Sequence, residues 1–232
     1  MLEPLEILQL FSSSFNQEEM SGKSILITAG PTQEPIDPVR YITNRSSGKM
    51  GYSLAEAAIQ SGAEVTLISG PVHIDPPEKC NFIPIETAVE MYEAVMHHIK
   101  GKDVYIGTAA VADYSPANFN ESKIKKEESS SSLTLELQKN RDILKSVSKL
   151  ANRPYVVGFA AETDDLLDNA EKKLINKGLD LIIANDVSNK EIGFDSDDNE
   201  VTLITTTEKK YLEKQNKKKI SKKIIEFISL AV

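Results

Sequence analysis

The chain has 232 residues, 40% of them hydrophobic, and carries 27 Lys and Arg against 35 Asp and Glu, a formal net charge of −8. That composition excludes a mostly disordered protein, and the acidic balance argues against a general nucleic-acid binder. The single cysteine, Cys80, excludes an intrachain disulfide and is best interpreted as an incidental thiol. No run approaches the roughly 20 apolar residues that span a bilayer, and residues 1–15 lack a secretory signal pattern. We therefore expect a cytoplasmic protein with no membrane partner.

The first half of the chain alternates strands with helices. Residues 1–22 have the composition of a tail or linker, and we expect the folded body to start at residue 23. Apolar runs and helical periodicity predict a strand at 24–28, a helix at 49–61, a strand at 64–68, a helix at 86–99 and a strand at 104–107. Crossovers of this kind build a parallel sheet with helices on its faces.

The same alternation resumes in the second half. It predicts a helix at 142–150, a strand at 155–159, a helix at 164–177, strands at 179–184 and 201–206, and a basic amphipathic helix at 216–229. We therefore predict one Rossmann-like α/β domain over residues 23–232, with a mostly parallel sheet and helices on both faces.

A polar segment interrupts this alternation between Tyr114 and Ser132. It is rich in Asn, Lys, Glu and Ser, and after Phe119 its only strongly apolar residue is Ile124. Such a composition cannot pack a core. We predict a mobile lid at about 115–132, and a tolerated insertion without function is the alternative.

The loop between the first strand and the first helix has features of an anion site. Residues 46–48 (Ser-Ser-Gly) precede the helix, where free backbone N–H groups favour a phosphate. A P-loop is absent, because Thr43 and Met50 occupy the positions where it needs glycine and a hydroxyl residue. The dinucleotide fingerprint is also absent, and no acid ends the strand at 64–68, which argues against an NAD(P)-dependent reductase.

Several charged residues stand where a phosphate ligand could be held. Asp113 follows the strand at 104–107 and either binds a ligand or starts an ordinary turn. Lys173 and Lys177 fall on the apolar face of their helix, so they either meet an anionic partner or snorkel from its end. Lys123 lies in the predicted lid, although a lysine run in a loop is more often simply solvated.

Taken together, these residues resemble the phosphopantothenate–cysteine ligase family of coenzyme A biosynthesis. The matching segments keep the family's order and are Ile27–Thr32, Pro35–Ile42, Asn44–Gly51, Ala109–Tyr114, Lys123–Lys126, Lys139–Leu144, Val157–Thr163 and Ala184–Ser188. Each segment alone is modest, but eight of them in register over residues 24–206 make a specific match.

The resemblance implies a two-step ligase. The carboxylate of 4′-phosphopantothenate attacks the α-phosphate of a nucleotide and releases pyrophosphate, and the amine of cysteine then displaces the nucleotide to form an amide. The resemblance favours CTP over ATP as co-substrate, with Mg²⁺, and implies a homodimer. Metal ligands are unknown: Asp113 and Asp142 are candidates, although the triphosphate itself can hold most of the ion.

The resemblance also assigns residues to roles. Asn44 corresponds to the residue that handles the acyl-nucleotidylate, and Lys123 corresponds to the lid lysine needed to form it. Arg141 departs from the proline that is common in relatives, which alters how this loop meets the triphosphate. The nucleotide pocket carries over to Gly107, Thr108, Ala109, Asp113, Lys123, Arg141, Asp142, Ile143, Leu144, Phe159, Lys173 and Lys177.

The opening residues Met1–Pro4 resemble the substrate-recognition tail of the flavin-dependent decarboxylase that many bacteria fuse ahead of this ligase. We therefore expect the ligase half of a bifunctional protein, with a decarboxylase domain as its natural partner; a separate ligase with a leftover tail is the alternative. A non-catalytic nucleotide-binding module on the same fold is the rival function, and the intact Asn44 and Lys123 argue against it.

Overall fold

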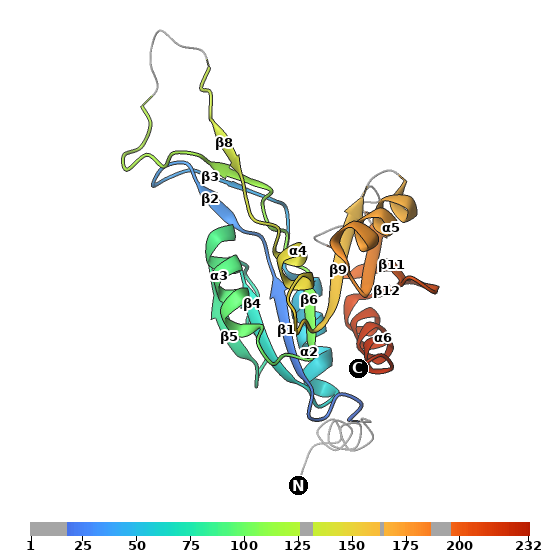
Figure 1. Cartoon of the computed structure of the whole chain (residues 1–232). Coiled ribbons are helices and arrows are strands. Elements are labelled where there is room, and N and C mark those ends of the chain that lie inside the picture. The colour runs from blue at the N-terminus through green and yellow to red at the C-terminus, as the bar shows by residue number, and fades with distance from the viewer. Residues whose placement is uncertain (1–17, 126–131, 163–164, 187–195) are drawn as a thin grey trace.

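A computed structural model describes residues 18–125, 132–162, 165–186 and 196–232. Its centre is an eight-stranded sheet in the order β12-β11-β10-β9-β6-β1-β4-β5 (Figure 1). The strands that run parallel are β1 (Ser24–Ala29), β4 (Glu64–Ser69), β5 (Asn81–Pro84), β6 (Val104–Gly107), β9 (Tyr155–Glu162) and β10 (Leu181–Asp186). β11 (Asp198–Ile204) is antiparallel to both of its neighbours, β10 and β12 (Lys209–Asn216). The predicted Rossmann-like, mostly parallel sheet is confirmed.

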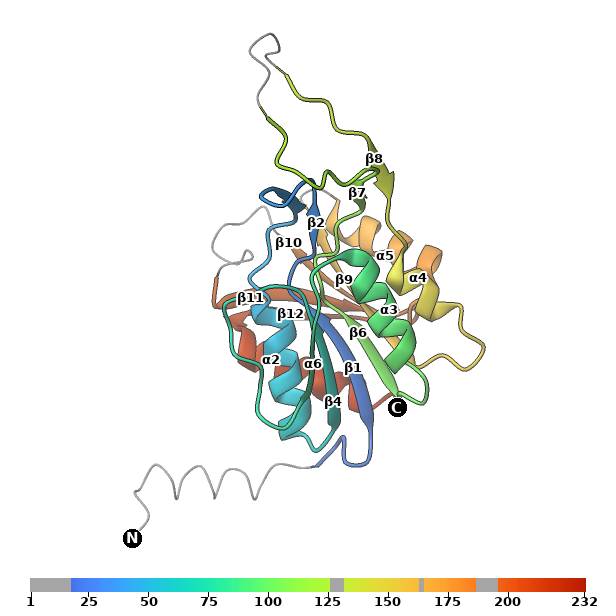
Figure 2. The ribbon, with the colours of Figure 1, turned by 90° about the vertical axis from the view of Figure 1, so that its left-hand side faces the viewer.

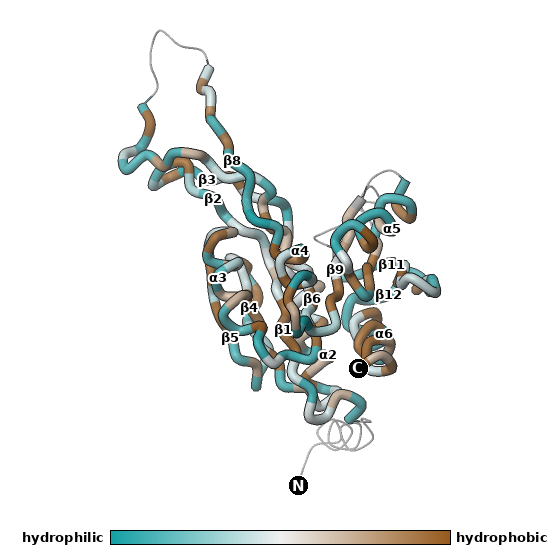
Figure 3. The backbone as a smooth tube through the Cα atoms, in the orientation of Figure 1, coloured by the Kyte–Doolittle hydropathy of each residue, from teal (hydrophilic) through white to brown (hydrophobic). Residues whose placement is uncertain are grey.

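Helices cover both faces of the sheet, as predicted (Figures 1 and 2). One hydrophobic cluster contains residues of α2 (Lys49–Gln60) and α6 (Lys217–Ser229). A second cluster, on the other face, contains residues of α3 (Ala88–His98), α4 (Ile143–Ser148) and α5 (Leu166–Lys177). Apolar residues concentrate along the strands and on the helix faces that meet them (Figure 3).

Local sequence explains where these helices begin and end. The Thr87 hydroxyl caps α3 by accepting the Glu90 N–H, and the Glu90 carboxylate reaches back to the Thr87 N–H, a complete capping box. Gly178, with φ 66°, ends α5 in the left-handed conformation that glycine adopts most easily. In α6 the isoleucines are buried while most of the lysines are exposed, which confirms the predicted amphipathic helix.

Two strands of the central sheet were missed by the sequence prediction. β5 spans only four residues and ends at Pro84, so it lacks an extended apolar run. β12 is dominated by charged and polar side chains, and Leu212 is its one buried residue. Both are edge strands, and one neighbour's backbone fixes such a strand without a strong hydrophobic signal.

Two short hairpin-like ribbons extend beyond the carboxyl edge of the sheet (Figure 1). β2 (Gln33–Pro35) pairs with β3 (Tyr41–Thr43), and β7 (Tyr114–Pro116) pairs with β8 (Leu137–Lys139). We call residues 33–43 and the described part of 114–139 the arm. The predicted lid belongs to the arm; its residues 126–131 lie outside the described part, as do residues 1–17 of the predicted tail.

The packed body reaches slightly further toward the N-terminus than the sequence predicts. Met20 is fully buried in the cluster that contains α2 and α6, and its N–H donates to Ser61 O. Among the described residues, no helix is both long and apolar enough to cross a bilayer.

Candidate functional site

A cavity of about 580 Å³ opens beyond the carboxyl ends of β1, β6 and β9. After β1 the chain forms β4 on one side and then crosses to β6 on the other, so the strand order reverses at this point. Parallel sheets bind their ligands at such a switch point. The cavity is of the size that holds a nucleotide-sized ligand.

The first turn of α2 lies directly against the strand ends. A Cβ atom on Gly51 would approach Ala29 Cβ and Thr108 Oγ1 to 2.5 Å each, which is closer than non-bonded atoms pack. Gly48, the residue before the helix, has φ 76°. Glycine at these two positions lets the start of α2 reach the cavity floor.

Hydrogen bonds fix the loop that follows β6. The Thr108 hydroxyl donates to Thr28 O over 2.6 Å. The N–H of Ala112 donates to the buried hydroxyl oxygen of Thr32 over 3.0 Å, and the Asn140 side chain donates to Ala112 O over 2.9 Å. The cavity floor is therefore held in place by contacts to three other segments of the chain.

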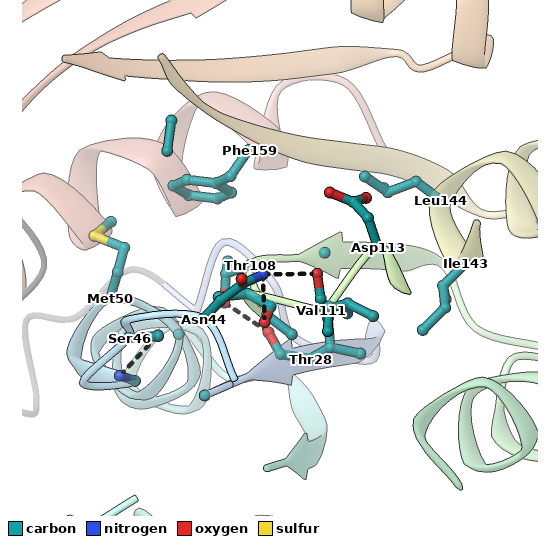
Figure 4. A pocket seen from close by; sticks show the side chains of 18 of the residues that line it. Thr28, Asn44, Ser46, Met50, Thr108, Val111, Asp113, Ile143, Leu144 and Phe159 are labelled. Carbon is teal, nitrogen blue, oxygen red and sulfur yellow. Dashed lines mark hydrogen bonds between the residues drawn. The ribbon is translucent and has the colours of Figure 1, made fainter. Parts of the chain in front are cut away.

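Asn44 lines the cavity (Figure 4). It lies between Met50 on one side and Ile143 on the other. Its amide nitrogen donates to Val111 O over 3.0 Å and to Ala110 O over 3.4 Å. The amide nitrogen thus has two backbone acceptors, and the bond to Ala110 O is the weaker because it is longer.

Lys173 and Lys177 reach the cavity from α5. The Lys177 Nζ atom lies 2.8 Å from Asp142 Oδ2, and the Lys173 Nζ donates to Phe159 O over 3.1 Å. Burial opposes ionisation of Asp142, but the Lys177 hydrogen bond, the Lys145 N–H and the charges of both lysines together lower its pKa below the ordinary value. The question that helical periodicity raised is answered for Lys177, because it meets an anionic partner.

The cavity is strongly positive although the chain is acidic. Seven basic residues line it against two acids, in a protein of net charge −8. Such focusing of one sign of charge favours a polyanionic ligand. The basic residues are Arg45, Lys49, Lys139, Arg141, Lys173, Lys177 and Lys217, and the acids are Asp113 and Asp142.

Four of these basic residues, Arg45, Lys49, Lys139 and Lys217, were not among the predicted site residues. Lys49 Nζ lies 2.7 Å from Asp197 Oδ1, and Lys217, which is 5% exposed, donates from Nζ to Ser196 O. Lys217 stands in a run of three lysines at the start of α6. No sequence signal separated this buried lysine from its solvated neighbours, because burial here comes from a contact across the fold.

The structure brings together twelve of the thirteen residues that the resemblance assigned, and Lys123 is the exception. Lys123 is exposed on the arm and does not line the cavity. Arg141 lines it, with its guanidinium 4.9 Å from the centre of the Tyr92 ring, a cation–π distance. The residues that line the cavity are Asn44, Gly107, Thr108, Ala109, Asp113, Arg141, Asp142, Ile143, Leu144, Phe159, Lys173 and Lys177.

The carboxylates offer little for a metal held by protein alone. In the described part of the chain, no three His, Cys, Asp or Glu side chains gather in a way that could hold an ion. Asp142 is paired with Lys177, whereas Asp113 is exposed at the cavity rim. Burial raises the pKa of the Cys80 thiol, which is consistent with an unreactive cysteine.

Comparisons with known proteins show the family of the chain. A family model described as the DNA/pantothenate metabolism flavoprotein C-terminal domain matches residues 20–231. The "Coenzyme A biosynthesis bifunctional protein CoaBC" of Vibrio vulnificus (strain CMCP6) is 51% identical over 229 residues, which are 98% of this chain and 57% of the relative. The chain therefore spans little more than half of that relative's length.

Solved structures share the fold. The crystal structure of the C-terminal domain of a Coenzyme A biosynthesis bifunctional protein CoaBC aligns with a TM-score of 0.79 and 40% identity, over 92% of this chain and 97% of that one. A Cab2 mutant in complex with phosphopantothenate-cysteine aligns with a TM-score of 0.72, over 99% of this chain and 94% of that one. At 20% identity, that second likeness shows the fold alone.

Proposed function

The chain belongs to the family of the DNA/pantothenate metabolism flavoprotein C-terminal domain, and from this premise we propose that it is a phosphopantothenate–cysteine ligase of coenzyme A biosynthesis. The observation that carries the proposal is the strand-end cavity, which is lined by seven basic residues and by Asn44. Both substrates of the first step, a nucleoside triphosphate and a phosphorylated carboxylate, are polyanions. Positive potential in the cavity serves both.

The proposed reaction has two balanced steps. A carboxylate oxygen of 4′-phosphopantothenate attacks the α-phosphorus of the nucleotide, and the bond from that phosphorus to the β-phosphate breaks to release pyrophosphate. The amine of cysteine then attacks the acyl carbon, the nucleoside monophosphate leaves, and the amine loses a proton. The product is an amide.

The α4–α5 side of the cavity is the proposed nucleotide end. Lys173 and Lys177 supply positive charge there, and the Phe159 ring, which points into the cavity, offers an apolar surface for a base (Figure 4). CTP is the proposed nucleotide in preference to ATP, on the family resemblance. Mg²⁺ is proposed to bind mainly through the triphosphate, with Asp113 as the candidate carboxylate because Asp142 is paired with Lys177.

Asn44 is the proposed stabiliser of the acyl-nucleotidylate. Its amide can donate to a developing negative charge in place of the 3.4 Å bond to Ala110 O, which is the longer of its two backbone bonds. Removing a single donor of this kind typically raises the activation free energy by about 3 kcal/mol.

Lys123 is the proposed source of positive charge for pyrophosphate release. Because it lies on the arm outside the cavity, it must be brought to the triphosphate by the arm of its own chain or of a second copy. A homodimer is proposed, since large apolar side chains are exposed along the arm. They are Val39, Tyr41, Tyr114, Phe119, Leu133 and Leu137.

The natural partner is proposed to be a decarboxylase domain. This part of the proposal is supported by the bifunctional relatives, of which the chain covers 57% in the Vibrio vulnificus case. The alternative, a non-catalytic nucleotide-binding module, would bind nucleotide and release nothing.

Pyrophosphate release tests the function. The chain is mixed with Mg²⁺, 4′-phosphopantothenate and either CTP or ATP, first without and then with cysteine. We expect release that requires phosphopantothenate and continuous turnover that requires cysteine. Asn44→Ala should accumulate the acyl-nucleotidylate. An absence of release with both nucleotides would favour the binding-module alternative.

A further inference from the structure

A buried carboxylate organises the turn between β2 and β3. Asp37 is 2% exposed. Its Oδ1 atom accepts the N–H groups of Val39 (2.9 Å) and Arg40 (3.0 Å), which is enough to form the turn. Its Oδ2 atom accepts the side chain of Arg40 through Nε, at 3.0 Å, and through Nη2. The second oxygen is therefore not required by the turn itself.

That second oxygen also holds a residue 87 positions further along the chain. The N–H of Ile124 donates to Asp37 Oδ2 over 3.1 Å. Arg40 Nη2 donates to Ile124 O over 3.1 Å, so the same ion pair binds both backbone groups of Ile124. We call Asp37 and Arg40, with Ile124 between their polar groups, the clamp. The N–H of Asn120 adds a 3.1 Å bond to Ile36 O.

The clamp is electrostatically strong. The Arg40 guanidinium holds the pKa of Asp37 well below its usual range, against the opposing effect of burial, and the N–H groups of Val39, Ile124 and Arg40 add to it. Hydrogen bonds to such a charge are about twice as strong as neutral ones. The clamp therefore holds the segment around Ile124 to the β2–β3 ribbon, in addition to the bond between Asn120 and Ile36.

Lys123 immediately precedes the clamped residue. The N–H of Ile124 belongs to the peptide plane that also contains the Lys123 carbonyl and Cα, so fixing this N–H fixes the orientation of that plane. We propose that Asp37 is a positioning residue that sets where Lys123 stands on the arm. This inference rests on the proposed function, because the role of Lys123 in pyrophosphate release is itself part of that proposal.

Two variants break the clamp from opposite sides. Asp37→Asn removes the charge but keeps the size of the side chain. Ile124→Pro removes the N–H that Asp37 binds and leaves the Asp37–Arg40 pair in place, so the turn is preserved even if Asp37→Asn proves poorly folded. Because the proline ring also restricts the backbone of residues 123 and 124, only an effect that both variants share is assigned to the clamp. Ile124→Ala is the matched control, since it loses the side chain but keeps the N–H.

Three measurements are made on the full chain: amide hydrogen exchange in peptides spanning 120–125, the rate of phosphopantothenate-dependent pyrophosphate release, and the Kd for CTP. We expect Asp37→Asn and Ile124→Pro to raise exchange and slow release by about tenfold or more, because a hydrogen bond to a charged group is lost. The Kd for CTP should stay within about twofold, and Ile124→Ala should stay near wild type in all three.

Different failures have different meanings. Raised exchange with unchanged release would overturn the positioning role and leave the ligase function standing. Unchanged exchange in both clamp-breaking variants would show that the bond between Asp37 and Ile124 does not restrain residues 120–125 in solution, which also overturns the proposal. A wild-type chain that releases no pyrophosphate would refute the proposed function and, with it, the positioning role of Asp37.

Discussion

The strand-end cavity and the arm are built in different ways. The cavity is fixed by the core: Gly51 packs without room for a methyl group, and the Thr108 hydroxyl is tied to β1. The arm consists of two ribbons with three-residue strands and exposed apolar side chains, and within it Ile124 is tied to the β2–β3 turn by the Asp37–Arg40 ion pair. We infer that ligand binding belongs to the rigid sheet edge and nucleotide activation to the arm. Mutations should separate the two.

The sharpest separation is expected from Lys123→Ala. We predict that phosphopantothenate-dependent pyrophosphate release falls by about 100-fold or more, as when one charge-stabilising donor is removed from an active site. The Kd for CTP, measured by calorimetry, should change by less than about twofold, because Lys123 does not line the cavity. Lys125→Ala, at an exposed neighbour, is the control. Equal losses of affinity and rate would place Lys123 in ground-state binding.

Gly51→Ala tests the rigidity of the cavity. Its new methyl group would lie 2.5 Å from Ala29 Cβ and from Thr108 Oγ1. We predict a loss of about 1–3 kcal/mol in the free energy of unfolding by urea, together with weaker CTP binding. Ser53→Ala on the same helix should change neither by much. A Gly51→Ala chain with wild-type stability and affinity would show that the start of α2 shifts freely.

Lys177→Met should weaken CTP binding, the property that Lys123→Ala is expected to leave unchanged. Removing this cation from the cavity is expected to raise the Kd for CTP by about tenfold, because a charge-assisted contact is lost. Lys172→Met, on the exposed side of α5, is the matched control. If Lys177 pairs only with Asp142 and meets no ligand, affinity will be unchanged while stability falls slightly.

A smaller effect concerns pH. The pKa of Asp142 is lowered in the folded protein, so its stabilising contribution is fully present above the unfolded pKa of about 3.9 and is lost as pH falls through the folded value. The side chains of Asp142 and Lys177 are 35% and 26% exposed, which limits the gain to about 1 kcal/mol. The stability difference between wild type and Asp142→Asn should stay constant from pH 7 to about pH 4 and shrink below it.

Much of the cavity could be predicted from the sequence, because it is built from contiguous segments. Residues 107–113 and 139–144 each follow a strand or precede a helix, and the carboxyl ends of parallel strands must meet at one edge. The helical periodicity of the sequence predicts that Lys177 lies on the apolar face of α5. Its partner Asp142 could not be predicted, since 35 positions separate the two along the chain.

The arm shows where sequence reasoning stops. Strands of three residues carry too little periodicity to be recognised, so β2, β3, β7 and β8 were missed. The residues around Asp37 indicate only a turn, and its hydrogen bond to the N–H of Ile124 depends on how two loops meet in space. Lys217 is buried for a similar reason. Such contacts belong to tertiary structure and leave no local pattern.

Oxygen tracing tests the central claim most directly. The chain converts 4′-phosphopantothenate, labelled with ¹⁸O in its carboxylate, in the presence of CTP, Mg²⁺ and cysteine. The masses of the nucleotide and phosphate products are then measured by mass spectrometry. Attack on the α-phosphorus predicts one ¹⁸O atom in CMP and none in pyrophosphate. Label in inorganic phosphate, with CDP as the other product, would mean attack at the γ-phosphorus, and the proposed acyl-nucleotidylate would be wrong.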